Sequence, residues 1–306
     1  FEKSPKPLGV FLRADTSKNI MNSECSTIDD NEDMKHKQHT EAMLSILYNT
    51  NKPIPKEYKR IQTRFQNMAN DGFDIICSQF SIHYYFQSEK IFQGFLKNVT
   101  DNINIDGYFI GTCYDGQRLF RHLESEPIFE YVDKTGNKIF KLEKKYDISD
   151  FTYKKKDIKN IFGNEIDVFM DSIGQTITEY LVNFDYFKDI MKQHGFEIMI
   201  PEKTISSKYS NIFRSDYFED GLGQFGTIID KLPEIKQYDD LFKKYSSAYD
   251  IYTHEPLRTL SSFNNYFIFK KVSKGWEDFD NHEGDLGAWG QPGENDAGNP
   301  LEQESW

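Results

Sequence analysis

Apolar residues along this chain form short unbroken runs that alternate with stretches of helical spacing. Residues 73–80 are one such run without polar alternation, which is typical of a parallel strand covered on both faces. Residues 88–99 instead place four apolar side chains on one helix face behind Ser88, a capping residue. The same reasoning predicts strands over residues 9–14, 73–80, 108–113, 196–200 and 263–272. It predicts helices over residues 34–50, 56–69, 88–99, 115–123, 179–193 and 239–249. This alternation indicates an α/β fold around a parallel sheet.

Two segments depart from the alternation. Residues 138–171 are β-rich and charged, which predicts an antiparallel excursion. Residues 275–306 are rich in Gly, Pro and Asn, and they hold nine acidic residues but no Lys or Arg. We therefore expect one domain over residues 1–274 and an acidic, disordered tail. The tail carries nine of the twelve net negative charges, so the body is nearly neutral and an anionic ligand is not excluded.

Composition narrows the class of protein further. Hydrophobic residues make up 38% of the chain and aromatic residues 15%, which is enough for a buried core. Cys25, Cys77 and Cys113 form no CxxC pair, so we expect neither a zinc site nor a disulfide framework. We therefore expect the protein to act in a reducing, cytoplasmic setting. No apolar stretch reaches the roughly 18 residues that span a membrane. The chain begins with Phe1, so we expect it to be a piece of a longer protein.

Residues 73–121 carry a specific arrangement of motifs. A strand ends in Gln79-Phe80, His83-Tyr84 follows, Ser88 begins a helix, and a Gly107-Tyr-Phe-Ile-Gly-Thr112 strand comes next. This arrangement resembles the mRNA cap guanine-N7 methyltransferases, particularly those within capping enzymes of large DNA viruses. The resemblance runs in order over residues 8–272. Three further segments agree with it: Phe11-Leu-Arg-Ala-Asp-Thr-Ser-Lys-Asn19, Thr178-Glu-Tyr-Leu-Val-Asn-Phe184 and Asn265-Tyr-Phe-Ile-Phe269.

The resemblance implies a fold, a cofactor and partners. The fold is a class I S-adenosylmethionine-dependent methyltransferase (Rossmann-like) sheet with helices on both faces and an antiparallel insertion. The methyl donor is S-adenosylmethionine, and the substrate is the capped 5′ end of mRNA, with no role for DNA or a membrane. Triphosphatase and guanylyltransferase domains of the same polypeptide are the implied partners.

The sequence departs from the family pattern at two places. The family's Thr-x-Pro is here Thr112-Cys113-Tyr114. The Gly-rich turn that binds the cofactor after the first strand does not lie upstream of Asp15, so we expect the first two strands to be missing. The segment Gly221-Leu-Gly-Gln-Phe-Gly226 does match G-x-G-x-x-G, but it follows polar residues, and we interpret it as a chance loop match.

The chemistry implied by the resemblance requires positioning and no general base. Guanine N7 has a free lone pair and no proton to lose, so the protein must only hold acceptor and donor in line. Such positioning can lower a barrier by about 7–11 kcal/mol. We therefore predict no catalytic side chain and no metal, and expect a guanine clamp beside a cofactor pocket.

By resemblance, five residues form the guanine clamp. Glu179 accepts hydrogen bonds from N1–H and N2–H, and His83 donates to O6. Phe80, Tyr84 and Tyr266 stack on the base or shape the pocket, and their attraction increases when N7-methylation makes the base cationic.

The cofactor side is assigned to three residues in the same way. Asp15 accepts a hydrogen bond from the adenine amino group, with Thr16 beside it. Gln79 lines the methyl-donor side.

Alternatives stay open at several of these residues. His83 can be a loop histidine, Glu179 a helix-dipole acid, Tyr266 a core residue and Asp15 a turn residue. The basic residues of helix 56–69, and Lys154-Lys-Lys156, either follow RNA phosphates or form solvated faces, and we favour the solvated faces. For the whole chain, the alternatives are a non-catalytic cap-binding or partner module and a methyltransferase for a small molecule. The latter leaves the combination of His83, Glu179 and Tyr266 unexplained.

Overall fold

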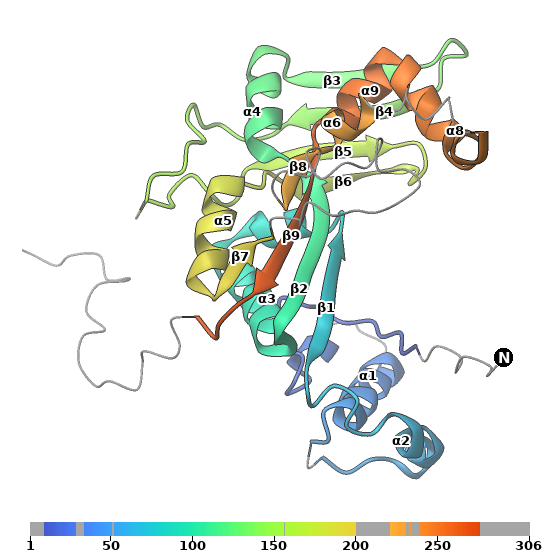
Figure 1. Cartoon of the computed structure of the whole chain (residues 1–306), viewed down its shortest axis with the longest axis vertical. Coiled ribbons are helices and arrows are strands. Elements are labelled where there is room, and N and C mark those ends of the chain that lie inside the picture. The colour runs from blue at the N-terminus through green and yellow to red at the C-terminus, as the bar shows by residue number, and fades with distance from the viewer. Residues whose placement is uncertain are drawn as a thin grey trace, which may run out of the picture.

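The computed structural model describes residues 9–28, 34–50, 52–155, 157–199, 221–230, 233 and 239–275. Its main sheet has the strand order β1-β2-β9-β7, with β8 also paired to β9 (Figure 1). β1 and β2 are parallel, whereas β7, β8 and β2 each run antiparallel to β9. The strands of this sheet are β1 (Phe73–Gln79), β2 (Ile103–Tyr114), β7 (Phe196–Ile198), β8 (Leu222–Gln224) and β9 (Asn264–Lys271).

Two helices, α3 (Glu89–Asn102) and α5 (Phe184–Gln193), pack on one face of the main sheet. Ser88 and Asn183 cap them, each accepting a hydrogen bond from a backbone N–H in the first turn. The core between helices and sheet is aromatic and fully buried, as Phe92, Phe109 and Phe187 illustrate. The α/β class is confirmed. Among the described residues, the expected helical cover is present on this face only.

The second sheet is antiparallel, with the order β3-β4-β5-β6. Its strands are β3 (Ile128–Val132), β4 (Lys138–Lys144), β5 (Glu165–Met170) and β6 (Gln175–Tyr180). This sheet confirms the antiparallel excursion expected over residues 138–171 and extends beyond it on both sides. Helix α4 (Gly116–Ser125) buries Leu119 and Leu123 in a separate core with Leu142 and Val168 of this sheet.

The other helices lie towards the ends of the molecule. Figure 1 shows α1 (Met34–Leu47) and α2 (Lys59–Phe65) beyond the start of β1, and α6 (Phe225–Ile229), α8 (Asp239–Thr253) and α9 (Glu255–Ser262) near the second sheet. Short 3₁₀ helices occur at η1 (Glu24–Ser26), η2 (Lys56–Tyr58) and η3 (Ile82–Gln87). In the described part of the chain, no helix is long and apolar enough to cross a membrane.

The structure corrects three predictions about elements. Residues 9–14 pair with no strand among the described residues, and Phe11 is 92% exposed, so the predicted buried strand is wrong. In the described part of the sheet β1 is an edge strand, and its Ile75 is 59% exposed, so cover on both faces is also wrong. The predicted helix 179–193 begins only at Phe184, because the β-branched residues before Glu179 continue the pairing with β5.

The expected helix 56–69 is shorter than predicted: it ends at Phe65, and Asn67 adopts a left-handed conformation with φ 69°. The predicted tail lies outside the described residues, apart from Gly275.

Candidate functional site

The candidate site begins where β1 ends. Phe80 turns the chain with a left-handed φ of 49°, and its N–H donates to the carbonyl of Thr112 at 2.8 Å. Helix η3 follows at once and carries His83 and Tyr84. The carboxyl ends of parallel strands commonly form ligand crevices, so this turn lies where a site is expected.

His83 of η3 and Glu179 of β6 lie next to each other, although 96 residues separate them along the chain. The Nε2 atom of His83 lies 3.5 Å from Oε1 of Glu179, and the residues are only 4% and 7% exposed. Neither ring nitrogen of His83 has a hydrogen-bond partner among the described residues, and the same holds for Oε2 of Glu179. Because buried polar atoms are nearly always paired, this group is prepared for a polar ligand.

Burial disfavours charge on both members of this pair. It raises the pKa of Glu179 to about 7 and lowers the pKa of His83 to about 4. The distance alone would allow an ion pair, but near pH 7 the imidazole is neutral and the carboxyl is only partly ionised. The pair therefore offers one N–H donor and, once ionised, a carboxylate acceptor.

Two tyrosines flank the pair. The Tyr84 ring stands edge-on to the His83 ring with 4.2 Å between centroids, and Tyr84 is 39% exposed. Burial raises the pKa of Tyr114, and the nearby Glu179 carboxylate raises it further, so this phenol keeps its proton. Sequence reasoning noted Tyr114 only as a departure from a family motif, whereas the structure brings it close to Glu179.

A second group of residues lies side by side on β1, β2 and β9, next to the turn at Phe80. Tyr266 of β9 pairs with Thr112 of β2, whose Oγ1 donates to Oε1 of Gln79 at 2.7 Å. Tyr266 is partly buried, and Phe80 is 52% exposed. The structure thus forms two groups, His83–Tyr84–Glu179 and Gln79–Phe80–Tyr266, which the turn after β1 connects.

The Gly221–Gly226 motif packs against this second group, because it contacts Tyr266 and Phe80. It lies in β8 and the start of α6, so the interpretation as a loop is wrong. A Cβ on Gly223 would lie 2.1 Å from the Tyr266 hydroxyl oxygen, and only a glycine lets that ring lie across the strand. The Phe225 ring contacts the Phe80 ring edge-on at 6.3 Å between centroids. Sequence reasoning missed Gly223 and Phe225, although a glycine within a strand signals a close approach.

Asp15 forms a turn, as the alternative interpretation expects. Its Oδ1 accepts hydrogen bonds from the backbone N–H of Ser17 at 3.0 Å and the Ser17 hydroxyl at 2.6 Å, and Lys18 lies 3.2 Å from Oδ2. Burial acts to raise the pKa of Asp15, but these contacts outweigh burial and keep the pKa below its ordinary value. Asp15 is therefore an ionised carboxylate that contacts Ser17 through Oδ1 and Lys18 through Oδ2.

Helix α3 holds the segment 15–20 in place. Asn98 donates to the carbonyls of Thr16 at 2.8 Å and Lys18 at 2.7 Å, and it accepts from the N–H of Ile20 at 3.1 Å. A Cβ on Gly94 would lie 1.9 Å from the Ser17 carbonyl oxygen, so the helix touches this segment backbone to backbone.

The segment also contacts η3, the helix that carries His83 and Tyr84. The Thr16 hydroxyl hydrogen-bonds with the Tyr85 hydroxyl of η3, one residue after Tyr84. A cavity of about 260 Å³, lined by Thr16, Tyr85 and Cys77 among others, lies between the segment, β1 and α3. Asp15 and Gln79 do not line this cavity.

Comparison with known proteins gives one family. The model of the mRNA (guanine-N(7))-methyltransferase domain matches residues 12–248. A probable mRNA-capping enzyme of Acanthamoeba polyphaga mimivirus is 28% identical over 217 residues, covering 67% of this chain and 18% of that protein.

Fungal proteins give similar matches. The mRNA cap guanine-N(7) methyltransferase of Aspergillus niger is 29% identical over 127 residues, covering 42% of this chain and 20% of its own. That of Saccharomyces cerevisiae is 26% identical over 128 residues, covering 41% and 28%. The chain thus spans less than a third of each of these relatives.

Proposed function

The chain belongs to the mRNA (guanine-N7)-methyltransferase domain family, and we propose that it holds the guanine of an mRNA cap for methylation at N7. The observation that carries this proposal is the buried pair of His83 and Glu179, because both ring nitrogens of His83 and Oε2 of Glu179 have no hydrogen-bond partner among the described residues. A buried carboxyl group beside a neutral imidazole is costly to maintain without a ligand that satisfies it.

The pair complements the polar edge of guanine. The base presents N1–H and N2–H as donors and O6 as an acceptor. The Glu179 carboxylate accepts from the two donors, and His83 donates its ring N–H to O6. Phe80, Tyr84 and Tyr266 supply aromatic faces around the base, which attract it more strongly once N7 is methylated.

S-adenosylmethionine is the proposed methyl donor. When bound, it supplies an electrophilic methyl group. Asp15 fits its adenine end, because an ionised carboxylate accepts a hydrogen bond from the amino group, with Thr16 beside it. Gln79 lines the methyl-donor side. No Gly-rich turn after a parallel strand occurs among the described residues, so the rest of the cofactor needs further structure.

The edge of β1 is the proposed place for that further structure. It pairs with no strand in the described part of the chain, and the partly exposed Ile110 and the exposed Ile75 lie on the uncovered face of the sheet. We propose that the first strands of the methyltransferase sheet join here. The capped 5′ end of mRNA is then the substrate, and triphosphatase and guanylyltransferase domains of the same polypeptide are partners.

Titration calorimetry tests the proposal. The unmethylated cap dinucleotide and S-adenosylmethionine are titrated separately into the wild type, Glu179→Ala and Asp15→Ala. Glu179→Ala removes charge-assisted hydrogen bonds and should weaken cap binding by about 10- to 100-fold while cofactor binding is kept. Asp15→Ala should weaken cofactor binding while cap binding is kept. The variant Glu197→Ala, an exposed carboxylate on β7, is the matched control and should bind both ligands normally.

The outcomes also separate the alternatives. Loss of both ligands in Glu179→Ala would contradict its assignment to guanine. Cap binding without cofactor binding in the wild type would support the guanine assignment and would leave cofactor binding dependent on the proposed further strands. A degenerate Gly-rich turn in those strands would then favour a non-catalytic cap-binding module. Binding of neither ligand by a folded chain would overturn the proposed function.

A further inference from the structure

The helices α1 and α2 form a strongly cationic projection. Residues 34–65, here called the cationic arm, contain seven Lys or Arg and two acidic residues, whereas the whole chain has a net charge of −12. Figure 1 shows both helices beyond the start of β1, at the opposite end of that strand from the candidate site. Such a local excess of positive charge, against the trend of the chain, favours a polyanionic partner.

The charge is densest around α2. Lys56, Lys59, Arg60 and Arg64 are all exposed, and none forms an ion pair with another described residue. Glu57 is the single acidic residue within this stretch.

The spacing of these cations works against the helix. Lys56, Arg60 and Arg64 recur every four residues, which places like charges side by side and destabilises a helix. Lys56 and Lys59 also begin the helical stretch, where the dipole favours anions. A face that served only solubility would alternate its signs. The arrangement is therefore better explained by a bound polyanion than by the solvated face favoured from sequence.

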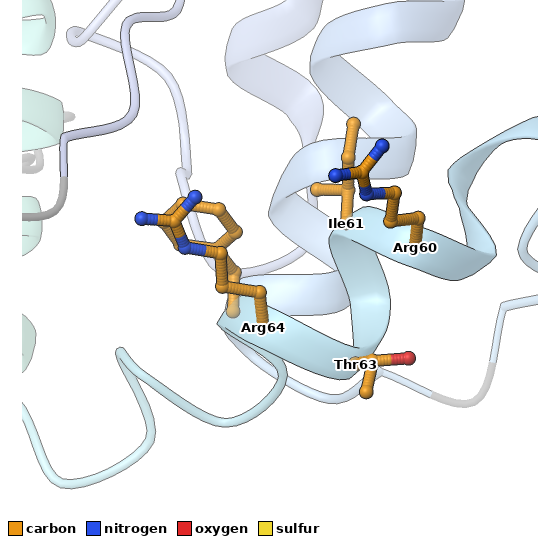
Figure 2. A pocket seen from close by; sticks show the side chains of 5 residues that line it. Arg60, Ile61, Thr63 and Arg64 are labelled. Atoms are coloured by element: carbon orange, nitrogen blue, oxygen red, sulfur yellow. The ribbon is translucent and has the colours of Figure 1, made fainter.

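The side chains form an open pocket suited to phosphates and bases. It has a volume of about 610 Å³ and is lined by Arg60, Ile61, Thr63, Arg64 and Phe65. Figure 2 shows Arg60 and Arg64 projecting from the same side of α2, with Thr63 directed away from them. The Arg64 guanidinium lies 5.4 Å from the centre of the Phe65 ring. Guanidinium groups bind phosphates in a bidentate manner, and an aromatic ring can stack with a base.

We propose that the cationic arm binds the sugar-phosphate backbone of the transcript downstream of the cap. This inference rests on the proposed function of the candidate site. β1 alone separates the two places by about 23 Å at the usual rise per residue, so a cap dinucleotide cannot contact both. The arm thus acts on transcripts and not on the isolated cap.

Salt-dependent RNA binding tests the arm. Anisotropy of a labelled RNA of about 20 nucleotides, capped or uncapped, is measured over a range of salt concentrations with the wild-type chain. Each phosphate contact to a single strand contributes about −0.7 to the slope of log K against log salt. Arg60→Gln with Arg64→Gln should therefore make the slope less negative by about 1.4 for both RNAs. Glutamine keeps the helix propensity of arginine, so α2 should stay folded.

Two further double variants sharpen the test. Arg60→Lys with Arg64→Lys keeps both charges and should keep most of the wild-type slope. Lys134→Gln with Lys192→Gln removes two exposed lysines that form no ion pair with other described residues, and it should leave the slope unchanged. Binding of the cap dinucleotide should be equal in all of these proteins.

The results distinguish the two proposals. An unchanged slope in Arg60→Gln with Arg64→Gln, or an equal change in the lysine control, would overturn the role of the arm. Failure of the wild type to bind the cap dinucleotide would overturn the proposed function, while the slope for uncapped RNA would still report on the arm alone.

Discussion

Cap binding should depend on pH through Glu179. The carboxyl must be ionised to accept hydrogen bonds from guanine N1–H and N2–H, yet burial raises its pKa to about 7 in the free protein. His83 does not interfere above pH 6, because burial lowers its pKa to about 4 and it stays neutral. The proton on Glu179 must therefore leave when the base binds.

The size of the effect follows from the titration curve. With a pKa of about 7, roughly 90% of Glu179 is ionised at pH 8 and about 10% at pH 6. The dissociation constant of the cap should thus increase about tenfold between pH 8 and pH 6. An unshifted carboxyl, with a pKa of 4.5, would give almost no change over this range.

Calorimetry with the unmethylated cap dinucleotide measures this directly. Titrations at pH 6 in buffers of different ionisation enthalpy should reveal the release of nearly one proton per cap. Glu179→Gln should bind weakly and without pH dependence. A wild-type affinity that stays flat from pH 6 to pH 8, with the fold intact by circular dichroism, would refute the reasoning.

The same shift predicts a cost in stability. A carboxyl whose pKa is higher in the folded state stabilises the fold at low pH, and this contribution is lost as the pH rises from 4.5 to about 7. Above pH 7 the cost is as much as about 3 kcal/mol. Glu179→Gln should therefore raise the free energy of unfolding at pH 8, measured in urea, while it weakens cap binding. A loss of stability at pH 8 would contradict the assigned shift.

Three further variants test the packing around the site. Gly223→Ala places a methyl group 2.1 Å from the Tyr266 hydroxyl oxygen and should weaken cap binding about tenfold by calorimetry, whereas Gly226→Ala in the same segment should not. Gly94→Ala should displace the segment 15–20 and lower the affinity for S-adenosylmethionine more than that for the cap. Asn183→Ala removes the α5 cap and a buried hydrogen bond to the Phe151 carbonyl, so urea unfolding should show a loss of about 2 kcal/mol. Equal affinities in the two glycine variants of β8–α6, or an unchanged unfolding free energy, would contradict these expectations.

Local signals in the sequence were sufficient where an element is specified by its own residues. Ser88 and the apolar face behind it predicted α3, and the structure shows the capping hydrogen bond. The strands β2 and β9 were predicted from the apolar residues at their centres, 108–113 and 266–269, and each strand is paired on both sides in the sheet. Their ordering in the sheet could not be derived in this way, since pairing between residues 108 and 270 is a property of the whole fold.

Glu179 shows where local signals fail. Its neighbours Leu181 and Phe184 have helical spacing, which predicts that Glu179 lies in the first turn of a helix. The structure instead pairs Glu179 with Ile166 of β5, a contact that no local pattern specifies. The helix-dipole alternative is therefore wrong, and burial beside His83 explains the residue better. The proposed role in guanine binding came from the resemblance and stays a prediction.

The error over β1 concerns the surroundings of the strand and not its existence. Its apolar residues indicated cover on both faces, yet Ile75 is 59% exposed and Phe73 42% exposed. An apolar edge strand with free backbone groups is prone to pair with other chains, so proteins usually cover or pair such an edge. The mismatch between an interior-type sequence and an exposed strand falls on the same sheet edge where the cofactor-binding strands are proposed. Covering that edge would resolve the mismatch and would complete the cofactor site with the same strands.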